Sequence, residues 1–133
     1  MRRLALVLAG VLAGIAATAQ AHHSWSVDYD TSQRVTVAGT VTEFLRRRPH
    51  PAFVMEVEQT DGEVVQWTVE FSGGFRDSSG NTYDAAYFEP GEALTVTGQP
   101  HRDADRNFVR LRSVIRDSDG ERFERNRDRN RRR

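Results

Sequence analysis

The sequence predicts an all-β fold: a small OB-like five-stranded barrel that follows a cleavable export signal. Five segments alternate apolar and polar residues with a period of two, which is typical of half-buried strands. An irregular segment rich in Gly and Ser separates the third of these segments from the fourth, and this order matches an OB fold. A plain β-sandwich or meander has the same periodicity and remains an alternative.

The first 21 residues have the pattern of a secretory signal peptide. A basic start at Arg2 and Arg3 precedes an uncharged apolar run over residues 4–17. Ala19-Gln20-Ala21 then has small residues at the two positions that a signal peptidase recognises. The apolar run is shorter than the ~20 residues that a membrane-spanning helix needs. We therefore expect cleavage after residue 21, an exported protein (periplasmic or secreted) and no transmembrane span.

Composition divides the remaining chain into one domain and a tail. We expect an OB-like β domain over residues 22–119 and a disordered Arg-rich tail over residues 120–133. Residues 22–120 hold 10 arginines against 16 acidic residues, whereas residues 121–133 hold 7 arginines against 3. Cysteine and lysine are absent, so disulfides and Schiff-base chemistry on a lysine are excluded.

The strands are bounded by residues that interrupt pairing. Gly39 lies inside the first strand and indicates a bulge or a close backbone approach. Pro49 and Pro51 prevent pairing in the following loop. Asp61-Gly62 is a hairpin signal. The expected strands are residues 34–44, 52–58, 63–71, 93–98 and 108–116.

Three segments carry further expectations. Residues 22–30 alternate, which predicts an extended segment with Trp25, Val27 and Tyr29 facing the core. Residues 72–90 are expected to form a short helical or irregular insert, with a helical turn around residues 83–88. In the last strand, Val114 is expected on the face opposite Leu111.

The four histidines of the chain suggest a metal site. His22 and His23 begin the mature chain, while His50 and His101 each follow a proline in the loops after the first and fourth strands, which are neighbours at one rim of an OB-like barrel. The terminal amine and the His22 imidazole can chelate one ion, and nitrogen ligands favour Cu(II) over other first-row divalent ions. The predicted site is therefore a copper-type one made by His22, His23, His50 and His101. The alternative is that these histidines are only solvated.

A basic surface is the second candidate. Arginines in the loop after the first strand, together with an aromatic residue of the third strand, resemble the pattern with which OB folds bind polyanions. An exported protein seldom meets nucleic acid, so we expect an anionic extracytoplasmic ligand or a protein partner instead. The alternative is that these arginines pair with carboxylates of the domain itself. The residues concerned are Arg46, Arg47, Arg48 and Trp67, with Arg102 and Arg106 in the neighbouring loop.

No pattern of catalytic residues is present, and we expect binding rather than catalysis. Glu56, Glu58, Glu63 and Glu70 lie on or beside the second and third strands, but their spacing marks no acid–base pair.

Several motifs occur in a fixed order between residues 22 and 119. They are AHHSWSVDYD, VTVAGTVTEF followed by Pro49-His50, WTVE and PGEALTVTGQP. This ordered set resembles a bacterial domain-of-unknown-function family of small exported proteins whose mature chains open with His-His-Ser. The resemblance implies export, a single β-barrel-like domain and His22, His23 and His50 as family features, and it implies no activity. The chain departs from the family pattern at Arg48, where the family has Asn, and over residues 72–88, so a family pocket built there is altered.

Overall fold

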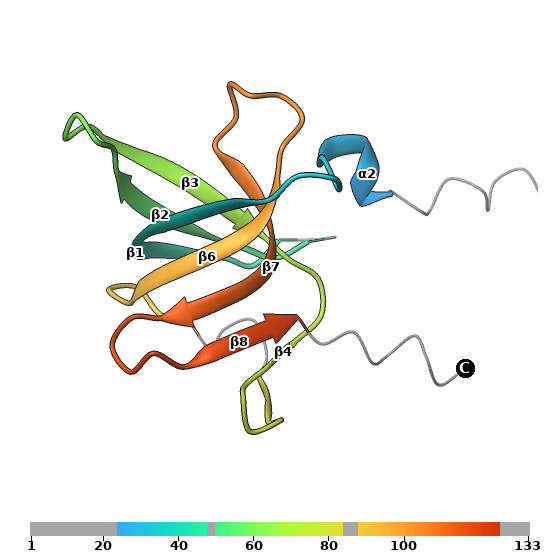
Figure 1. The fold of residues 1–133 in the computed structure, drawn as a ribbon, viewed down its shortest axis with the longest axis vertical. Helices are drawn as coiled ribbons and strands as arrows, with labels where there is room; N and C mark the ends of the chain where they lie inside the picture. The colour runs from blue at the N-terminus through green and yellow to red at the C-terminus, as the bar shows by residue number, and fades with distance from the viewer. Residues whose placement is uncertain (1–23, 48–49, 84–87, 126–133) are drawn as a thin grey trace, which may run out of the picture.

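A closed barrel of five strands forms the centre of the fold (Figure 1). The computed structural model describes residues 24–47, 50–83 and 88–125. The barrel strands are β1 (Val35–Leu45), β2 (Ala52–Glu58), β3 (Val64–Glu70), β6 (Ala93–Pro100) and β7 (Phe108–Arg116). They are hydrogen-bonded in the order β3-β2-β1-β6-β7, and a parallel pairing of β3 with β7 closes the ring. This closure confirms the predicted OB-like barrel and excludes an open meander or a sandwich.

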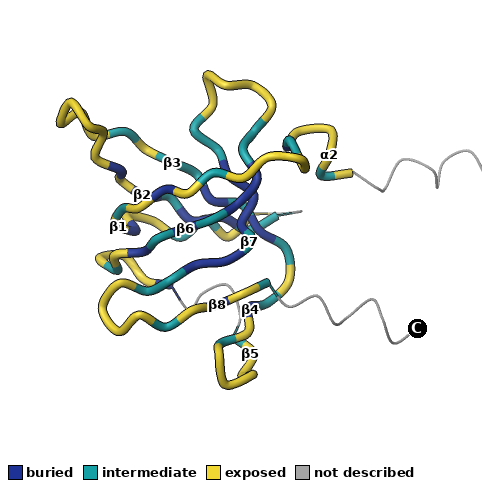
Figure 2. The backbone as a smooth tube through the Cα atoms, viewed as in Figure 1, coloured by how far each residue is buried: buried dark blue, intermediate teal, exposed yellow. Residues whose placement is uncertain are grey.

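The barrel core is apolar and lies between these strands. Figure 2 shows the buried stretches meeting inside the ring, while the hairpin ends are exposed. Alternating residues of each strand point inward, as the sequence pattern predicted. Buried representatives are Val37, Val41, Met55, Val69, Leu94, Val96 and Leu111. Trp67 of β3 packs against this core, as its position in the alternation predicted.

A bulge between β6 and β7 changes which residues of β7 face inward. The register shifts between Thr97 and Gly98, so the alternation changes phase after Leu111, and Val114 is fully buried. The expectation that Val114 faces away from the core was wrong for this reason. At Gly98 a Cβ would overlap the carbonyl oxygen of Arg110, so the close approach of the two strands requires glycine.

The N-terminal segment is a single helical turn, α2 (Trp25–Asp28), and not the extended segment predicted. The backbone N–H of Tyr29 donates to the carbonyl oxygen of Trp25 at 2.9 Å. In a helix these two residues share one face, and Tyr29 is 1% exposed whereas Val27 is 68% exposed. No helix in the described ranges is both long and apolar enough to cross a membrane.

A small extension continues the same sheet beyond β7. It consists of β8 (Arg122–Arg125), β4 (Phe75–Arg76) and β5 (Thr82–Tyr83), in the order β7-β8-β4-β5. Phe75, Phe88 and Phe123 are buried in the same hydrophobic cluster as the barrel core, with ring centroids 5.3 Å apart for Phe75 and Phe88 and 5.4 Å apart for Phe88 and Phe123. The predicted domain boundary at residue 119 is therefore corrected, because β8 belongs to the folded domain. Residues 84–87, from the predicted helical turn, and 126–133, from the predicted tail, lie outside the described ranges.

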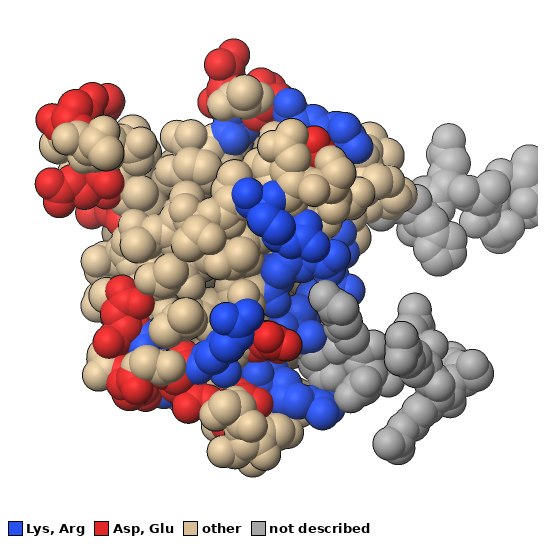
Figure 3. Space-filling view, viewed as in Figure 1, with Lys and Arg blue, Asp and Glu red and all other residues tan. Residues whose placement is uncertain are grey.

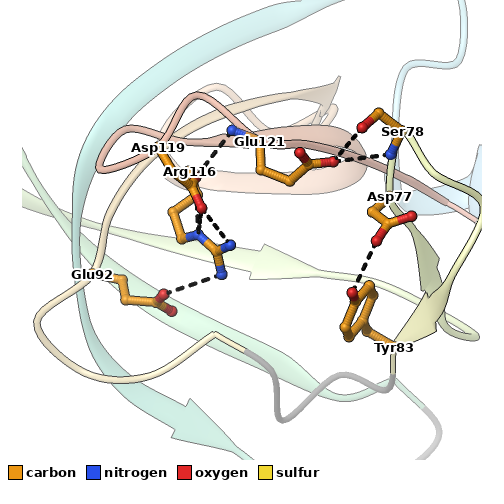
Figure 4. A network of polar contacts seen from close by, with 7 residues as sticks. All are labelled: Asp77, Ser78, Tyr83, Glu92, Arg116, Asp119 and Glu121. Atoms are coloured by element: carbon orange, nitrogen blue, oxygen red, sulfur yellow. Dashed lines mark hydrogen bonds and ion pairs between the residues drawn. The ribbon is translucent and has the colours of Figure 1, made fainter.

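Polar contacts connect the β7–β8 turn to its surroundings (Figure 4). Arg116 at the end of β7 donates from Nη2 to Asp119 at 2.7 Å and lies 3.9 Å from Glu92. On the same turn, Glu121 accepts from the N–H and the hydroxyl of Ser78 at 2.9 and 2.7 Å. These contacts join the β7–β8 turn to the β4–β5 hairpin and to the turn before β6.

Candidate functional site

Three chain segments meet at one end of the barrel, which we call the rim. They are the N-terminal segment with α2, the β1–β2 loop and the β6–β7 loop. Trp25 stacks on His50, with ring centroids 3.9 Å apart and an interplanar angle of 32°. The centroid of the Tyr29 ring lies 5.5 Å from that of Trp25 and 5.5 Å from that of His101. The N-terminal segment therefore contacts both histidine-bearing loops.

Backbone hydrogen bonds hold the N-terminal segment against the β6–β7 loop. Tyr29 and His101 form an isolated antiparallel bridge, and the N–H of Asp30 donates to the carbonyl oxygen of Pro100 at 2.9 Å. The N–H of Arg102 donates to the carbonyl oxygen of Asp28 at 2.8 Å. The segment that contains α2 thus has a defined position on the rim.

A carboxylate at the end of β3 joins two of the rim segments. Oε2 of Glu70 accepts a hydrogen bond from the Tyr29 hydroxyl, and Oε1 lies 2.5 Å from Nη2 of Arg47 in the β1–β2 loop. Burial of the phenol, and next its hydrogen bond to Glu70, raise the pKa of Tyr29 well above its ordinary value. Tyr29 therefore remains a neutral donor at physiological pH.

Of the predicted metal ligands, the structure places His50 and His101 on the rim. His22 and His23 lie outside the described residues. Nδ1 of His101 accepts a hydrogen bond from the N–H of Asp103 at 3.0 Å, so the neutral ring carries its proton on Nε2. A metal ion on Nε2 would require the ring proton to move to Nδ1, so His101 could no longer accept this hydrogen bond. Among the residues that the structure describes, no group of three or more His, Cys, Asp or Glu side chains is arranged to hold a metal ion.

The predicted basic surface is divided by the fold. Arg47 is paired with Glu70, Arg46 lies over the Phe44 ring at 5.8 Å from its centroid, and Arg48 is outside the described residues. Trp67 lines an open cavity of about 370 Å³ beside the β6–β7 loop. Arg102, Arg106, His101 and Phe108 line the same cavity. The aromatic-plus-arginine combination therefore occurs at the β6–β7 loop.

One buried cation of the rim was missed by sequence reasoning. Arg110 of β7 is 8% exposed, lies 4.4 Å from the centroid of the Trp25 ring and donates to Oε1 of Gln99 at 3.1 Å. Burial, followed by the charges of Arg125 and Arg112, lowers its pKa to about 10, so it is charged at neutral pH. The alternation placed Arg110 opposite the core residues, but nothing in β7 itself indicates that a tryptophan from another segment covers it.

Comparison with known proteins identifies a family and no function. The model of a family described as a family of unknown function (DUF6152) matches residues 9–110, which is more than half of the chain. No curated protein and no solved structure matches the chain.

Proposed function

Since the chain belongs to this family of unknown function (DUF6152), we propose from its own residues that it is an exported protein that binds a copper-type divalent metal ion. Cleavage after Ala21 makes His22 the first residue of the mature chain. Its free amine and imidazole, together with the imidazoles of His23 and His50, form a nitrogen-only ligand set. Such a set favours Cu(II) over the other divalent first-row ions.

The stacking of Trp25 on His50 is the observation that carries this proposal. The two ring centroids are 3.9 Å apart, and Trp25 follows His23 by two positions and His22 by three. A residue spans at most ~3.6 Å of extended chain. The backbone of His22 is therefore within about 11 Å of that of Trp25, so the terminal histidines are within reach of the His50 imidazole.

The chemistry of the terminus sets the pH dependence of binding. Ordinary pKa values are about 8 for a terminal amine and about 6.5 for an imidazole. Protons therefore compete increasingly with the metal as the pH falls below neutrality. His101 contributes less to the proposed site than His50, because coordination through its Nε2 would disrupt the hydrogen bond that its Nδ1 accepts from Asp103.

A Cu(II) titration of two purified chains tests the proposal. One chain begins at His22, and the other carries one additional residue before it, which moves the amine away from the imidazole. We expect one-to-one binding by the first chain and much weaker binding by the second. His50→Ala should weaken binding by the first chain, and His101→Ala, the matched control, should weaken it less. Equal and weak binding of Cu(II) by both chains would contradict the proposal.

Export is tested separately. The protein recovered from the periplasmic or extracellular fraction of the native host should have His22 as its first residue when its N-terminus is sequenced. Recovery in the cytoplasm with the leader intact would contradict export whatever the outcome of the titration.

A second candidate function rests on the cavity lined by Trp67, Arg102 and Arg106. It combines an aromatic face with two cations, which suits an anionic extracytoplasmic ligand. Binding there should weaken as salt rises and should not depend on the free terminus. Arg106→Gln should reduce it and leave the Cu(II) titration unchanged.

A further inference from the structure

Four arginines line one pocket on β6, β7 and β8, on the face that points away from the barrel core. The pocket has a volume of about 250 Å³ and lies where the chain entering β1 meets these three strands. Its residues include Arg34, Arg112, Arg122 and Arg125 and the hydroxyl-bearing Thr97 and Ser113. None of these residues belongs to the predicted basic surface or to the rim cavity.

The register of the three strands brings these side chains together. Thr97 of β6 is paired with Ser113 of β7, and Ser113 is paired with Glu124 of β8. Paired residues of neighbouring strands point to the same side of a sheet. Nη2 of Arg122 lies 3.4 Å from the Ser113 hydroxyl oxygen, so this side chain reaches from β8 to β7. Apart from Arg34, which precedes β1, the residues of the pocket lie on strands.

The charge of the pocket is opposite to that of the domain. Its lining has four arginines and one carboxylate, Glu124, which pairs with Nε of Arg122 at 3.1 Å. Residues 22–125, which include β8, hold 12 arginines against 18 acidic residues. Figure 3 shows basic atoms gathered in a band that runs over this face toward β8. Neighbouring like charges repel each other, so bringing these guanidinium groups together costs free energy.

An independent effect on Arg110 supports this positive potential. After burial, the largest causes of its lowered pKa are the charges of Arg125 and Arg112, and Arg34 acts in the same direction. Three of the four pocket arginines are therefore close enough to disfavour a further positive charge beside them. An anion in the pocket would relieve the repulsion among these side chains.

We propose that this pocket binds a free tetrahedral oxyanion, phosphate or sulfate. Guanidinium groups present parallel N–H donors that match the spacing of oxyanion oxygens, and their charge strengthens each hydrogen bond. The hydroxyls of Thr97 and Ser113 supply further donors. The small volume favours an ion over a drug-sized organic ligand. This site is separate from the proposed metal site and does not depend on it.

Calorimetric titration of the purified protein with sodium phosphate and with sodium sulfate, in metal-free buffer of low ionic strength, tests the proposal. We expect one-to-one binding. Arg34→Gln and Arg122→Gln should each weaken it about tenfold or more, since each removes a charged donor. These positions are chosen because Arg34 is exposed and the Arg122 side chain is 54% exposed, so both variants should fold.

Two further variants separate a built site from general electrostatics. Glu124→Gln removes the one carboxylate among the described residues that line the pocket and should strengthen binding, an outcome that a purely structural role for Glu124 does not produce. Arg46→Gln removes one positive charge, as Arg34→Gln and Arg122→Gln do, but at a position outside the pocket, and it should leave binding unchanged. Absence of binding up to about 10 mM anion, or equal losses in Arg46→Gln and Arg34→Gln, would overturn the proposal.

Discussion

The Tyr29 hydroxyl donates a hydrogen bond to Oε2 of Glu70, a residue 41 positions away in the sequence. Arg47 binds the other oxygen of the same carboxylate. Glu70 therefore connects the segment that contains α2 to the loop that carries His50. This part-buried contact ties the N-terminal segment to the β1–β2 loop, in addition to the backbone hydrogen bonds that hold the same segment against the β6–β7 loop.

Removing this hydrogen bond should destabilise the protein. Tyr29→Phe keeps the buried ring but leaves Oε2 of Glu70 without its donor, at a cost of about 1–2 kcal/mol. Urea denaturation measures the change. The matched control is Tyr83→Phe, whose hydroxyl donates to Oδ2 of Asp77 at 2.8 Å. It should cost less because the same oxygen still accepts a hydrogen bond from Nδ2 of Asn81 at 2.8 Å. A Tyr29→Phe variant as stable as the wild type would contradict a stabilising role for the contact.

The same hydroxyl should make stability depend on alkaline pH. The pKa of Tyr29 is raised in the folded chain, while in the unfolded chain it is near the ordinary value of about 10. Above that value the unfolded chain has released the proton and the folded chain has not, so the free energy of unfolding falls as pH rises. The slope approaches about 1.4 kcal/mol per pH unit. Wild type should show this additional fall between pH ~10 and ~11.5, and Tyr29→Phe should not. If the free energy of unfolding falls with pH equally in the two proteins, the ionisation of Tyr29 does not cause the fall.

A Cβ at Gly98 should be more costly than one at a turn glycine. The new methyl group would overlap the Arg110 carbonyl and the Val109 side chain, so Gly98→Ala should lower the free energy of unfolding by about 3 kcal/mol. Gly62→Ala meets no atom within 4 Å but requires a φ of +86°, which costs about 1 kcal/mol. Thermal denaturation of the two variants compares these costs. Equal losses would show that close strand contact does not require Gly98.

Sequence periodicity predicted the five barrel strands because each buries one face in a single core. It could not predict the helical turn of α2, whose position depends on packing Trp25 against His50 and Arg110. It also missed β8, because a four-residue strand with three charged residues has almost no apolar alternation, and only the burial of Phe123 reveals its pairing.

The candidate sites differ in how far the sequence predicts them. Proximity of the histidine loops followed from the expected barrel topology, and the rim contacts of His50 and His101 agree with it. The oxyanion pocket has no local signal, because its arginines come from positions 34, 112, 122 and 125. Only the strand order brings these positions together.

The hydrogen bonds between Arg116 and Asp119 should stabilise the fold at neutral pH, and this contribution should be lost at acid pH. Its hydrogen bonds hold the pKa of Asp119 below the ordinary value. A carboxylate with a lowered pKa stabilises the fold above its unfolded pKa of about 4, and this contribution is lost as pH falls through the folded value. Asp119→Asn should therefore be less stable than wild type at pH 7, with the difference shrinking below pH ~4. Asp105→Asn, at an exposed position outside this network, is the control. A difference independent of pH would contradict the electrostatic origin.

Trp25 should act as a positioning residue for the proposed metal site although it supplies no ligand. Trp25→Ala removes the ring that lies 3.9 Å from His50, so the imidazole is no longer held against the terminal segment. If stacking is what brings His50 to the metal, the Cu(II) electron paramagnetic resonance spectrum of Trp25→Ala should change to that of His50→Ala. The double variant should add no further change. Val27→Ala, in the same helical turn but 68% exposed, should keep the wild-type spectrum. A wild-type spectrum in Trp25→Ala would show that His50 reaches the metal without this contact, whereas a wild-type spectrum in His50→Ala would remove His50 from the ligand set and leave only the terminal pair.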